Sequence, residues 1–532
     1  MSDKYRSNKG GEVTGISRRA VLAGAAGLGL AGAFGPLMTQ AAFAQDTPKR
    51  GGTFRVGMGQ ANTAEALDPA TNSTSLSIAF NMTRANTLAE YSASDDLVGA
   101  LAESWEATPD AKTWMFRLRK GVEFHNGKSL TTQDVIDTFN HHRGENSTSG
   151  AKATLASITD IKADGDGVVV FSLNAGNADF PAMTAAHQLA ILPSDGNGGL
   201  DIAAGVGTGG YKLESIEPGV RIELSRNENY WKSDAAYFDS VQLIAILDAA
   251  ARNNALISGQ VDVTERNDQS TLHLLAQDQR LTVDESPSAA HNNFAMATNM
   301  EPFTDPNIRR ALKYGVDRED ILRKTLFGHG YVGNDHPIAR SNKYFNPDLP
   351  QTSYDPDKAK FYLKEAGLDS IDVELITSDG AAVGAVAAAE LFSSTAAAAG
   401  INIKVNRVPS DGYFSDVWLK SPFAASDWGG RPTADLAFTI AYARDAAWNE
   451  THWDNERFNE LLVAARSELD EDRRRAMYYE MQELCNTDGG AIVLNFQNWI
   501  AVRNNKVARP STVSAQWPLD GYKAMERWWF NA

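Results

Sequence analysis

The chain has 532 residues, with 67 acidic and 50 basic side chains and a net charge of −17 at pH 7 with histidine neutral. A protein this acidic repels phosphate backbones, so we exclude nucleic acid as a partner. The single cysteine, Cys485, excludes an internal disulfide, and its place in a helical pattern predicts a small buried side chain rather than a nucleophile.

The first 44 residues have the pattern of an export signal. Two arginines at 18–19 precede an apolar run rich in glycine and alanine, and Ala-Phe-Ala at 42–44 fits a cleavage site. The paired arginines favour the twin-arginine export route, and an ordinary secretory signal stays open. Because the run is short and interrupted by Pro36, it does not favour a permanent membrane span. We therefore expect a signal cleaved near Ala44 and a periplasmic mature protein.

Residues 101–139 predict a strand, a turn and a helix in succession. Apolar and polar side chains alternate over 113–119, which is typical of a half-buried strand. An Asn-Gly pair at 126–127 predicts a turn. Thr131, followed three residues later by Asp134, predicts a helix N-cap with an apolar stripe behind it.

Signatures of catalysis are weak along the chain. The glycine-rich stretch at 27–32 lies inside the export signal, and the stretch at 205–210 precedes a strand pattern, whereas a phosphate-binding loop needs a helix there. None of the nine histidines forms an i, i+4 pair, so no local zinc motif is present. We expect no enzyme, no cofactor and no metal. An exported enzyme with a cofactor or metal remains the alternative.

Six segments, taken in order, resemble one family. They are 101–139, 207–231, 251–263, 302–322, 354–368 and 448–466. Together they are similar to the extracytoplasmic solute-binding proteins of peptide, dipeptide and nickel ABC importers, solute-binding family 5. The resemblance implies a receptor that captures a peptide-like or carboxylate-bearing solute between two lobes. A monomer that docks on an inner-membrane permease is expected, and a nickel-type metal-chelate binder stays open.

The chain length and the alternation of strand and helix patterns favour at least two α/β domains. The resemblance implies an α/β, two-lobed periplasmic-binding-protein fold of the large peptide-binder type, with an extra subdomain in the first lobe and a hinge between the lobes. The expected parts are a lobe I core of 45–86, 207–292 and 495–532, an extra subdomain of 87–206, and a lobe II of 293–494. The aromatic C-terminal segment is expected to dock onto a lobe.

The segment 426–438 is the main candidate for ligand contact. Gly429 and Gly430 lack side chains, so a ligand can approach their backbone closely, and Trp428 offers a flat apolar wall. A loop turn beside a core tryptophan explains the same residues without a ligand. In the peptide binders that the chain resembles, an aspartate three residues after the tryptophan grips the α-ammonium of the peptide, and here that position is Arg431.

This arginine changes the expected ligand. A guanidinium suits a carboxylate or phosphate, and an ammonium about 4 Å from it is disfavoured by roughly 4 kcal/mol at an effective dielectric of 20. Either a ligand carboxylate contacts Arg431, or Arg431 pairs with Asp427 or Asp435. The resemblance implies further ligand contacts in the first loop of lobe I, near a pocket aromatic, at the hinge and on lobe II. These residues are Asn86, Leu88, Tyr413, Asn292, Asn293 and Trp448.

Overall fold

A computed structural model describes residues 48–531. Residues 1–47 and 532 lie outside that part of the chain, and with them the predicted export signal over 1–44 and its cleavage site. The chain divides into two compact units after Asp46, and the described helices and strands belong to the unit Thr47–Ala532. Among the helices of the described residues, none combines the length and the apolarity that a membrane crossing needs.

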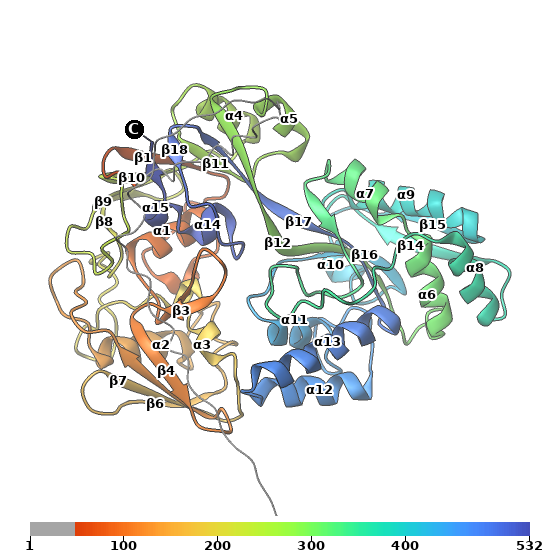
Figure 1. Cartoon of the computed structure of the whole chain (residues 1–532), viewed down its shortest axis with the longest axis horizontal. Coiled ribbons are helices and arrows are strands. Elements are labelled where there is room, and N and C mark those ends of the chain that lie inside the picture. The colour runs from red at the N-terminus through yellow and green to blue at the C-terminus, as the bar shows by residue number, and fades with distance from the viewer. Residues whose placement is uncertain (1–47, 532) are drawn as a thin grey trace, which may run out of the picture. The chain divides into compact units, whose positions relative to one another are not determined.

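A mixed sheet of 11 strands organises this unit (Figure 1). In sheet order the strands are β15 (Ile401–Arg407), β14 (Ile371–Thr377), β16 (Phe423–Trp428), β12 (Leu281–Met296), β17 (Ala491–Asn504), β11 (Val263–Glu265), β1 (Thr53–Met58), β10 (Ser240–Ala245), β9 (Arg221–Arg226) and β8 (Tyr211–Glu217), with β13 (Gly330–Val332) on β17. We call β11, β1, β10, β9 and β8 the first end of the sheet, and β16, β14 and β15 the second end.

The two central strands join these ends. β12 and β17 are antiparallel, from Leu281 opposite Asn504 to Ala295 opposite Ala491. β17 pairs with β11 at one end, and β12 pairs with β16 at the other. The chain therefore crosses between the two ends twice, and Figure 1 shows both strands running side by side across the middle. Their register is irregular between Pro287 and His291, close to the predicted hinge, whose role stays a prediction.

Helices and shorter strands complete the unit. The helices are α1 (Ser75–Arg84), α2 (Thr132–Arg143), α3 (Phe180–Met183), α4 (Ala249–Ile257), α5 (Leu272–Leu275), α6 (Pro306–Gly315), α7 (Arg318–Thr325), α8 (Pro356–Glu365), α9 (Ala385–Ala396), α10 (Tyr413–Asp416), α11 (Ala434–Ala441), α12 (Glu456–Ser467), α13 (Glu471–Thr487), α14 (Pro518–Tyr522) and α15 (Ala524–Arg527). The remaining strands are β2 (Ala89–Tyr91), β3 (Leu97–Gly99), β4 (Ala102–Ala107), β5 (Thr113–Leu118), β6 (Ile158–Ala163), β7 (Val168–Leu173), β18 (Val507–Ala508) and β19 (Trp529–Phe530).

A separate antiparallel sheet, β4-β5-β7-β6, carries its own core beside α2. The alternation predicted for β5 is confirmed, because Trp114, Phe116 and Leu118 are buried while the residues between them are more exposed. The predicted N-cap of α2 is confirmed too. The backbone N–H of Thr131 donates to the Asp134 carboxylate at 2.8 Å, and the Thr131 hydroxyl accepts from the Asp134 backbone, which closes a capping box.

The second end of the sheet is built from a parallel crossover. β14 alternates buried and exposed residues, α9 follows it, and β15 then pairs with β14 in parallel. Around these elements the apolar side chains of α6, α7 and α8 form one core, and those of α11, α12 and α13 form another. Cys485 of α13 is fully buried, as predicted.

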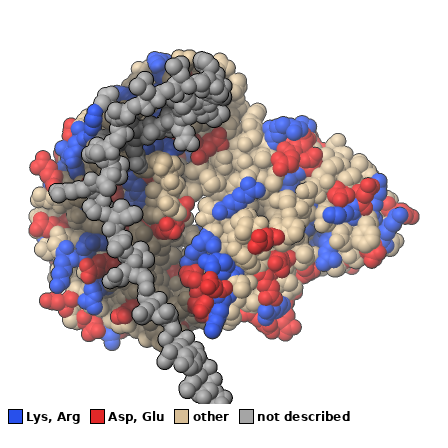
Figure 2. Space-filling view, in the orientation of Figure 1, with Lys and Arg blue, Asp and Glu red and all other residues tan. Residues whose placement is uncertain are grey.

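The C-terminal segment packs onto the first end of the sheet, as predicted. Trp528 is 1% exposed and its ring lies 6.5 Å from that of Phe54 in β1. On the surface, acidic and basic side chains are intermixed over the face that Figure 2 displays, so the net negative charge is not gathered there into a block of one sign. The exact domain boundaries given above stay predictions.

Candidate functional site

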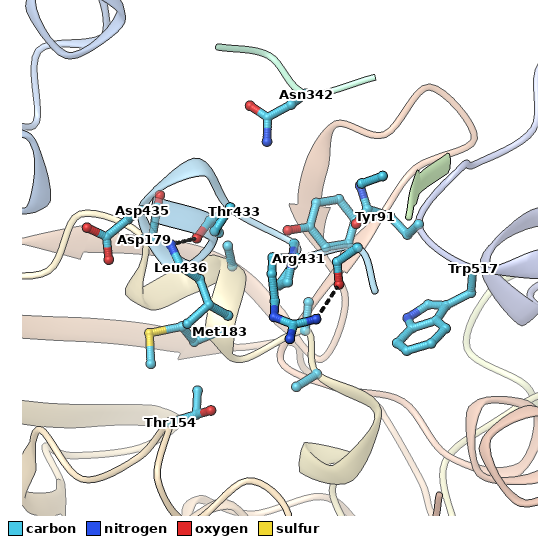
Figure 3. Close-up of a pocket in the computed structure, with 18 of the residues that line it drawn as sticks. Tyr91, Thr154, Asp179, Met183, Asn342, Arg431, Thr433, Asp435, Leu436 and Trp517 are labelled. Atoms are coloured by element: carbon cyan, nitrogen blue, oxygen red, sulfur yellow. Dashed lines mark hydrogen bonds between the residues drawn. The ribbon is translucent and has the colours of Figure 1, made fainter. Parts of the chain in front are cut away.

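A cavity of about 910 Å³ lies between the residues that pack at the two ends of the sheet. On one side it is lined by residues of α1, of β2, of the segment 179–187 and of the C-terminal segment, among them Met82, Glu90, Tyr91, Asp179, Met183, His187, Trp517, Asp520 and Lys523. From the other side it is lined by Pro337, Ile338, Ala339, Ser341, Asn342, Gly429 to Thr433, Asp435, Leu436, Ala437, Thr439 and Arg466. This size is ordinary for a small-molecule site, and Figure 3 shows labelled side chains from both sides facing the same space.

The loop between β16 and α11 forms one wall, and we call residues Gly429 to Thr433 the arginine loop. β16 ends at Trp428, and α11 begins after Thr433, whose hydroxyl caps the helix by accepting from the backbone N–H of Leu436 at 3.1 Å. The Arg431 Nη1 donates to the carbonyl oxygens of Gly429 at 2.9 Å and Gly430 at 3.2 Å. The loop thereby holds the guanidinium at the cavity wall (Figure 3).

Arg431 makes no ion pair with any carboxylate in residues 48–531. Asp435, one of its two expected partners, pairs instead with Arg466 at 3.1 Å. Partial burial lowers the pKa of the Arg431 guanidinium from its ordinary value, and no charged neighbour offsets this effect. Of the two alternatives for this residue, an internal pair with Asp427 or Asp435 is therefore not formed.

A buried carboxylate that the sequence did not reveal supports the wall behind this loop. Glu450 accepts hydrogen bonds from the indole N–H of Trp428 at 2.8 Å, from that of Trp418 at 2.5 Å, and from the Asn293 amide at 2.7 Å. Trp448 lies 6.2 Å from Trp428 between ring centroids. Glu450 thus fixes the orientation of Trp428, and the Arg431 guanidinium lies 5.8 Å from the Trp428 ring.

On the opposite side lies a group of buried ion pairs, which we call the paired cluster: Glu90, Lys232, Lys523 and Glu526. Lys232 Nζ contacts Glu90 at 2.5 Å and Glu526 at 2.6 Å, and Lys523 Nζ lies 3.2 Å from Glu526 and 3.5 Å from Glu90. Burial by itself raises the pKa of Glu526, but the two lysines and Arg527 overcome that effect and hold it well below its usual range.

Contacts between the two sides close the cavity at one edge. Asp179, which directly precedes α3, forms an ion pair with Arg474 of α13 at 2.8 Å, and both side chains are buried. Beside it the backbone N–H of Ala178 donates to the carbonyl of Arg466 at 2.7 Å. Burial lowers the pKa of Arg474, but Asp179 more than offsets this and raises it. We call these contacts the seam.

The structure places the predicted ligand-binding residues unevenly. Gly429, Gly430 and Arg431 line the cavity. Trp428 lies directly behind them, while Asn293 contacts Glu450 and Trp448 is about half exposed. These residues meet at one end of β16, and their contact with a ligand stays a prediction.

The other predicted residues do not line the cavity: three of them have side chains hydrogen-bonded within the protein, and the fourth, Leu88, is buried in an apolar core. The Asn86 carbonyl oxygen accepts from the Trp231 indole at 3.0 Å, and Leu88 is fully buried in the core of the β4–β7 subdomain. The Tyr413 hydroxyl donates to the Ala425 carbonyl at 2.8 Å. The Asn292 amide donates to the Asn495 side chain at 3.2 Å, across the two central strands.

Within residues 48–531, no group of three or more His, Cys, Asp or Glu side chains is arranged to hold a metal ion. The glycine-rich stretch at 205–210 leads into β8, as predicted from its strand pattern. The cavity wall offers hydrogen-bond donors, the Arg431 guanidinium outside any ion pair, and apolar surface, and each of these can bind a solute.

Comparison with known proteins supplies the family. The sequence pattern of the bacterial extracellular solute-binding proteins, family 5, middle region, matches residues 96–450. The di/tripeptide-binding protein 2 of Pseudomonas aeruginosa is 27% identical over 75% of this chain and 81% of its own. The dipeptide-binding protein of Escherichia coli is 25% identical over 77% of this chain and 83% of its own.

Solved structures show the same fold. HbpA2 from Haemophilus parasuis has a TM-score of 0.82 at 20% identity, covering 90% of this chain and all of that one. The architecture is therefore the two-lobed α/β fold of periplasmic binding proteins, with the cavity between the lobes. Since the family pattern spans most of the chain, the protein belongs to the bacterial extracellular solute-binding proteins, family 5.

Proposed function

We propose that this protein is the periplasmic substrate-binding receptor of an ABC importer. It captures a peptide-like or carboxylate-bearing solute between its lobes and delivers it to a permease of the inner membrane. The observation that carries this proposal is the cavity of about 910 Å³ lined from both lobes, with an unpaired guanidinium on one wall. Binding, with no bond made or broken, is the role that such a wall supports.

Closure of the lobes couples binding to transport in this proposal. A solute that touches both walls stabilises the closed form more than the open form, and so shifts the equilibrium between them. The seam contributes to the same equilibrium, because opening separates Asp179 from Arg474 and Ala178 from Arg466. The closed form is then the one that the permease recognises.

Location and partners follow from the same role. The twin-arginine-type signal predicted over 1–44 would deliver the folded chain to the periplasm, where it acts as a monomer. The relatives named above are, by their names, binders of dipeptides and tripeptides. Their similarity supports a solute of peptide size for this chain, and Arg431 supports one that carries a carboxylate.

The test is a thermal-shift screen of the protein against dipeptides, carboxylate metabolites, opines, sugars and divalent metal ions, followed by small-angle scattering on each hit. A ligand at 100 times its Kd stabilises the fold by about 2.7 kcal/mol, which such a screen detects. We expect a peptide-like or carboxylate compound to raise the Tm and to reduce the radius of gyration. Stabilisation by metal ions alone, or by no compound, would contradict the proposal.

A further inference from the structure

The ionisable side chains of the cavity wall are almost all neutralised by the protein itself. Lysine, arginine, aspartate and glutamate contribute eight side chains to the wall, and every one except Arg431 lies in an ion pair. The pairs are Glu90 with Lys523 and Lys232, Asp179 with Arg474, Arg266 with Glu265 at 3.4 Å, Asp435 with Arg466, and Asp520 with Arg527 at 3.0 Å.

Two further groups on the wall do not alter this balance at neutral pH. Burial lowers the pKa of His187 to about 4, so its imidazole is uncharged. Burial also raises the pKa of Tyr91 above its ordinary value, so its hydroxyl keeps its proton. The wall as a whole therefore carries one uncompensated charge, the positive charge of Arg431.

The free donors of Arg431 are available to a ligand. A guanidinium has five N–H donors, and among the hydrogen bonds of the described residues only Nη1 donates, to two neutral carbonyls of its own loop. Figure 3 shows the side chain extending from the arginine loop into the space bordered by Met183 and Trp517. A carboxylate placed there gains charge-assisted, two-pronged hydrogen bonds and restores electroneutrality.

An ammonium group finds no carboxylate on this wall that is free of an ion pair: Glu90, Asp179, Asp435 and Asp520 each have a cationic partner. Each of these carboxylates already has a cationic partner, and that partner would repel a ligand ammonium placed beside it. Repulsion from Arg431 adds to that cost. The remaining lining includes apolar side chains that suit an uncharged body: Met82, Met183, Ile338, Leu436, Trp499 and Trp517.

We propose that the solute is a carboxylic acid without a free ammonium group, of the class of N-acylated amino acids and short N-blocked peptides. Its carboxylate binds Arg431 and its uncharged remainder lies against the apolar lining. This inference rests on the proposed receptor function and narrows the solute to one charge class.

The experiment uses dipeptides in four charge forms that share the same side chains. Leu, Phe and Ala are combined at both positions, and each dipeptide is prepared free, N-acetylated, C-amidated, or blocked at both ends. Binding to the full protein is measured by calorimetry at pH 7. We expect the N-acetyl acids to bind at least about tenfold more tightly than both the free dipeptides and the doubly blocked forms, and the C-amides to bind least.

Variants assign that preference to one residue. Arg431→Gln should bring the N-acetyl acid and the doubly blocked form to within about threefold of each other. Arg431→Lys, which keeps the charge but loses the fork, should retain part of the preference. Arg444→Gln is the matched control, since it removes the same charge from an exposed pair with Asp454 outside the cavity, and it should bind like the wild type.

The outcomes separate this inference from the proposed function. Free dipeptides that bind more tightly than their N-acetyl forms would overturn the inference and leave the receptor role standing. A preference for acids that survives in Arg431→Gln would also overturn it. If none of the four forms bound to the wild-type protein, the peptide-like solute of the proposed function would fall, and this inference with it.

Discussion

The paired cluster and the arginine loop border the same cavity, but only the cluster balances its charged side chains with partners of opposite sign. In the cluster, two carboxylates and two ammonium groups lie within 2.5–3.5 Å of one another and balance. In the loop, Arg431 donates only to neutral carbonyls two residues and one residue before it. The charges of the paired cluster therefore balance without a ligand, whereas the charge of Arg431 has no counter-ion.

This difference separates structural charge from charge that serves binding. Buried groups that satisfy one another hold the fold in place and leave nothing for a solute to complete. A charged group beside a cavity that lacks a partner is instead a candidate for function. Perturbed pKa values alone do not make the distinction, because the pKa of Glu526 is shifted strongly within a fully paired group.

The largest expected effect comes from breaking the paired cluster with Glu526→Gln. The substitution keeps the shape of the side chain but leaves Lys232 and Lys523 to share Glu90, and removing one partner of a buried ion pair costs about 3–5 kcal/mol. Chemical denaturation should therefore show a clear drop in the free energy of unfolding. The substitution should also leave the paired cluster with one excess positive charge, so that neither the cluster nor the arginine loop is neutral.

The matched control for this change is Glu374→Gln. Glu374 also forms a short ion pair, with Lys404 at 2.7 Å, but both side chains are well exposed. An exposed pair contributes about 0–1 kcal/mol, so this variant should unfold almost like the wild type. Equal losses in the two variants would show that burial is not what makes the paired cluster important.

The second largest expected effect is a pH dependence of stability caused by His187. This residue lines the cavity on the side of the paired cluster, and its ring lies 5.8 Å from that of Trp517 between centroids. Burial lowers its pKa to about 4 in the folded protein, whereas an unfolded histidine titrates near 6.5. Between these values the unfolded chain binds a proton that the folded chain does not, so stability rises with pH there. Acidification from pH 7 to pH 5 should cost about 1–2 kcal/mol through this residue.

His187→Gln should therefore lose less stability on acidification than the wild type does, as measured by denaturant unfolding at several pH values. His141→Gln is the control of opposite sign. The hydrogen bond to Asp68 raises the pKa of His141 against the opposing effect of burial. It therefore stabilises the fold below pH 6.5 and loses that contribution as the pH rises through its folded value. A His187→Gln profile parallel to that of the wild type would contradict a neutral buried imidazole.

Local patterns in the sequence predicted the elements well. The alternation over 113–119 depends only on which side chains are apolar, and the strand that it predicted is β5. The Thr131 and Asp134 pair closes within one turn of helix, so its hydrogen bonds are decided by residues three apart. The resemblance to the peptide binders, rather than the local pattern alone, pointed to the arginine loop, and its glycines and arginine do line the cavity.

Long-range partners could not be predicted in the same way. Asp179 and Arg474 are distant in the chain, and no local pattern in the sequence indicates that they form an ion pair. Asn86 has the same donors and acceptors whether it faces a solute or the interior, and its bond to Trp231 appears only in the folded chain. The same is true of Glu450, which the sequence shows as one more acidic residue among 67.

The smallest expected effect sharpens the comparison at the arginine loop itself. Gly429 is not among the glycines with positive φ, and a methyl group added there would have the Arg431 Nη1 at 3.4 Å as its neighbour. Because alanine restricts the unfolded chain, Gly429→Ala should stabilise the fold by about 0.4–1 kcal/mol. The same methyl group occupies space beside the guanidinium, so binding of an N-acetyl dipeptide acid should weaken by about two- to fivefold.

The neighbouring glycine is the control for this change. At Gly430 the added methyl would lie 3.0 Å from the Ala289 side chain, so Gly430→Ala should gain no stability. Opposite signs for stability and affinity in Gly429→Ala, measured by denaturation and calorimetry, would mark the loop as shaped for its ligand, whereas gains in both would show that Gly429 does not face the solute.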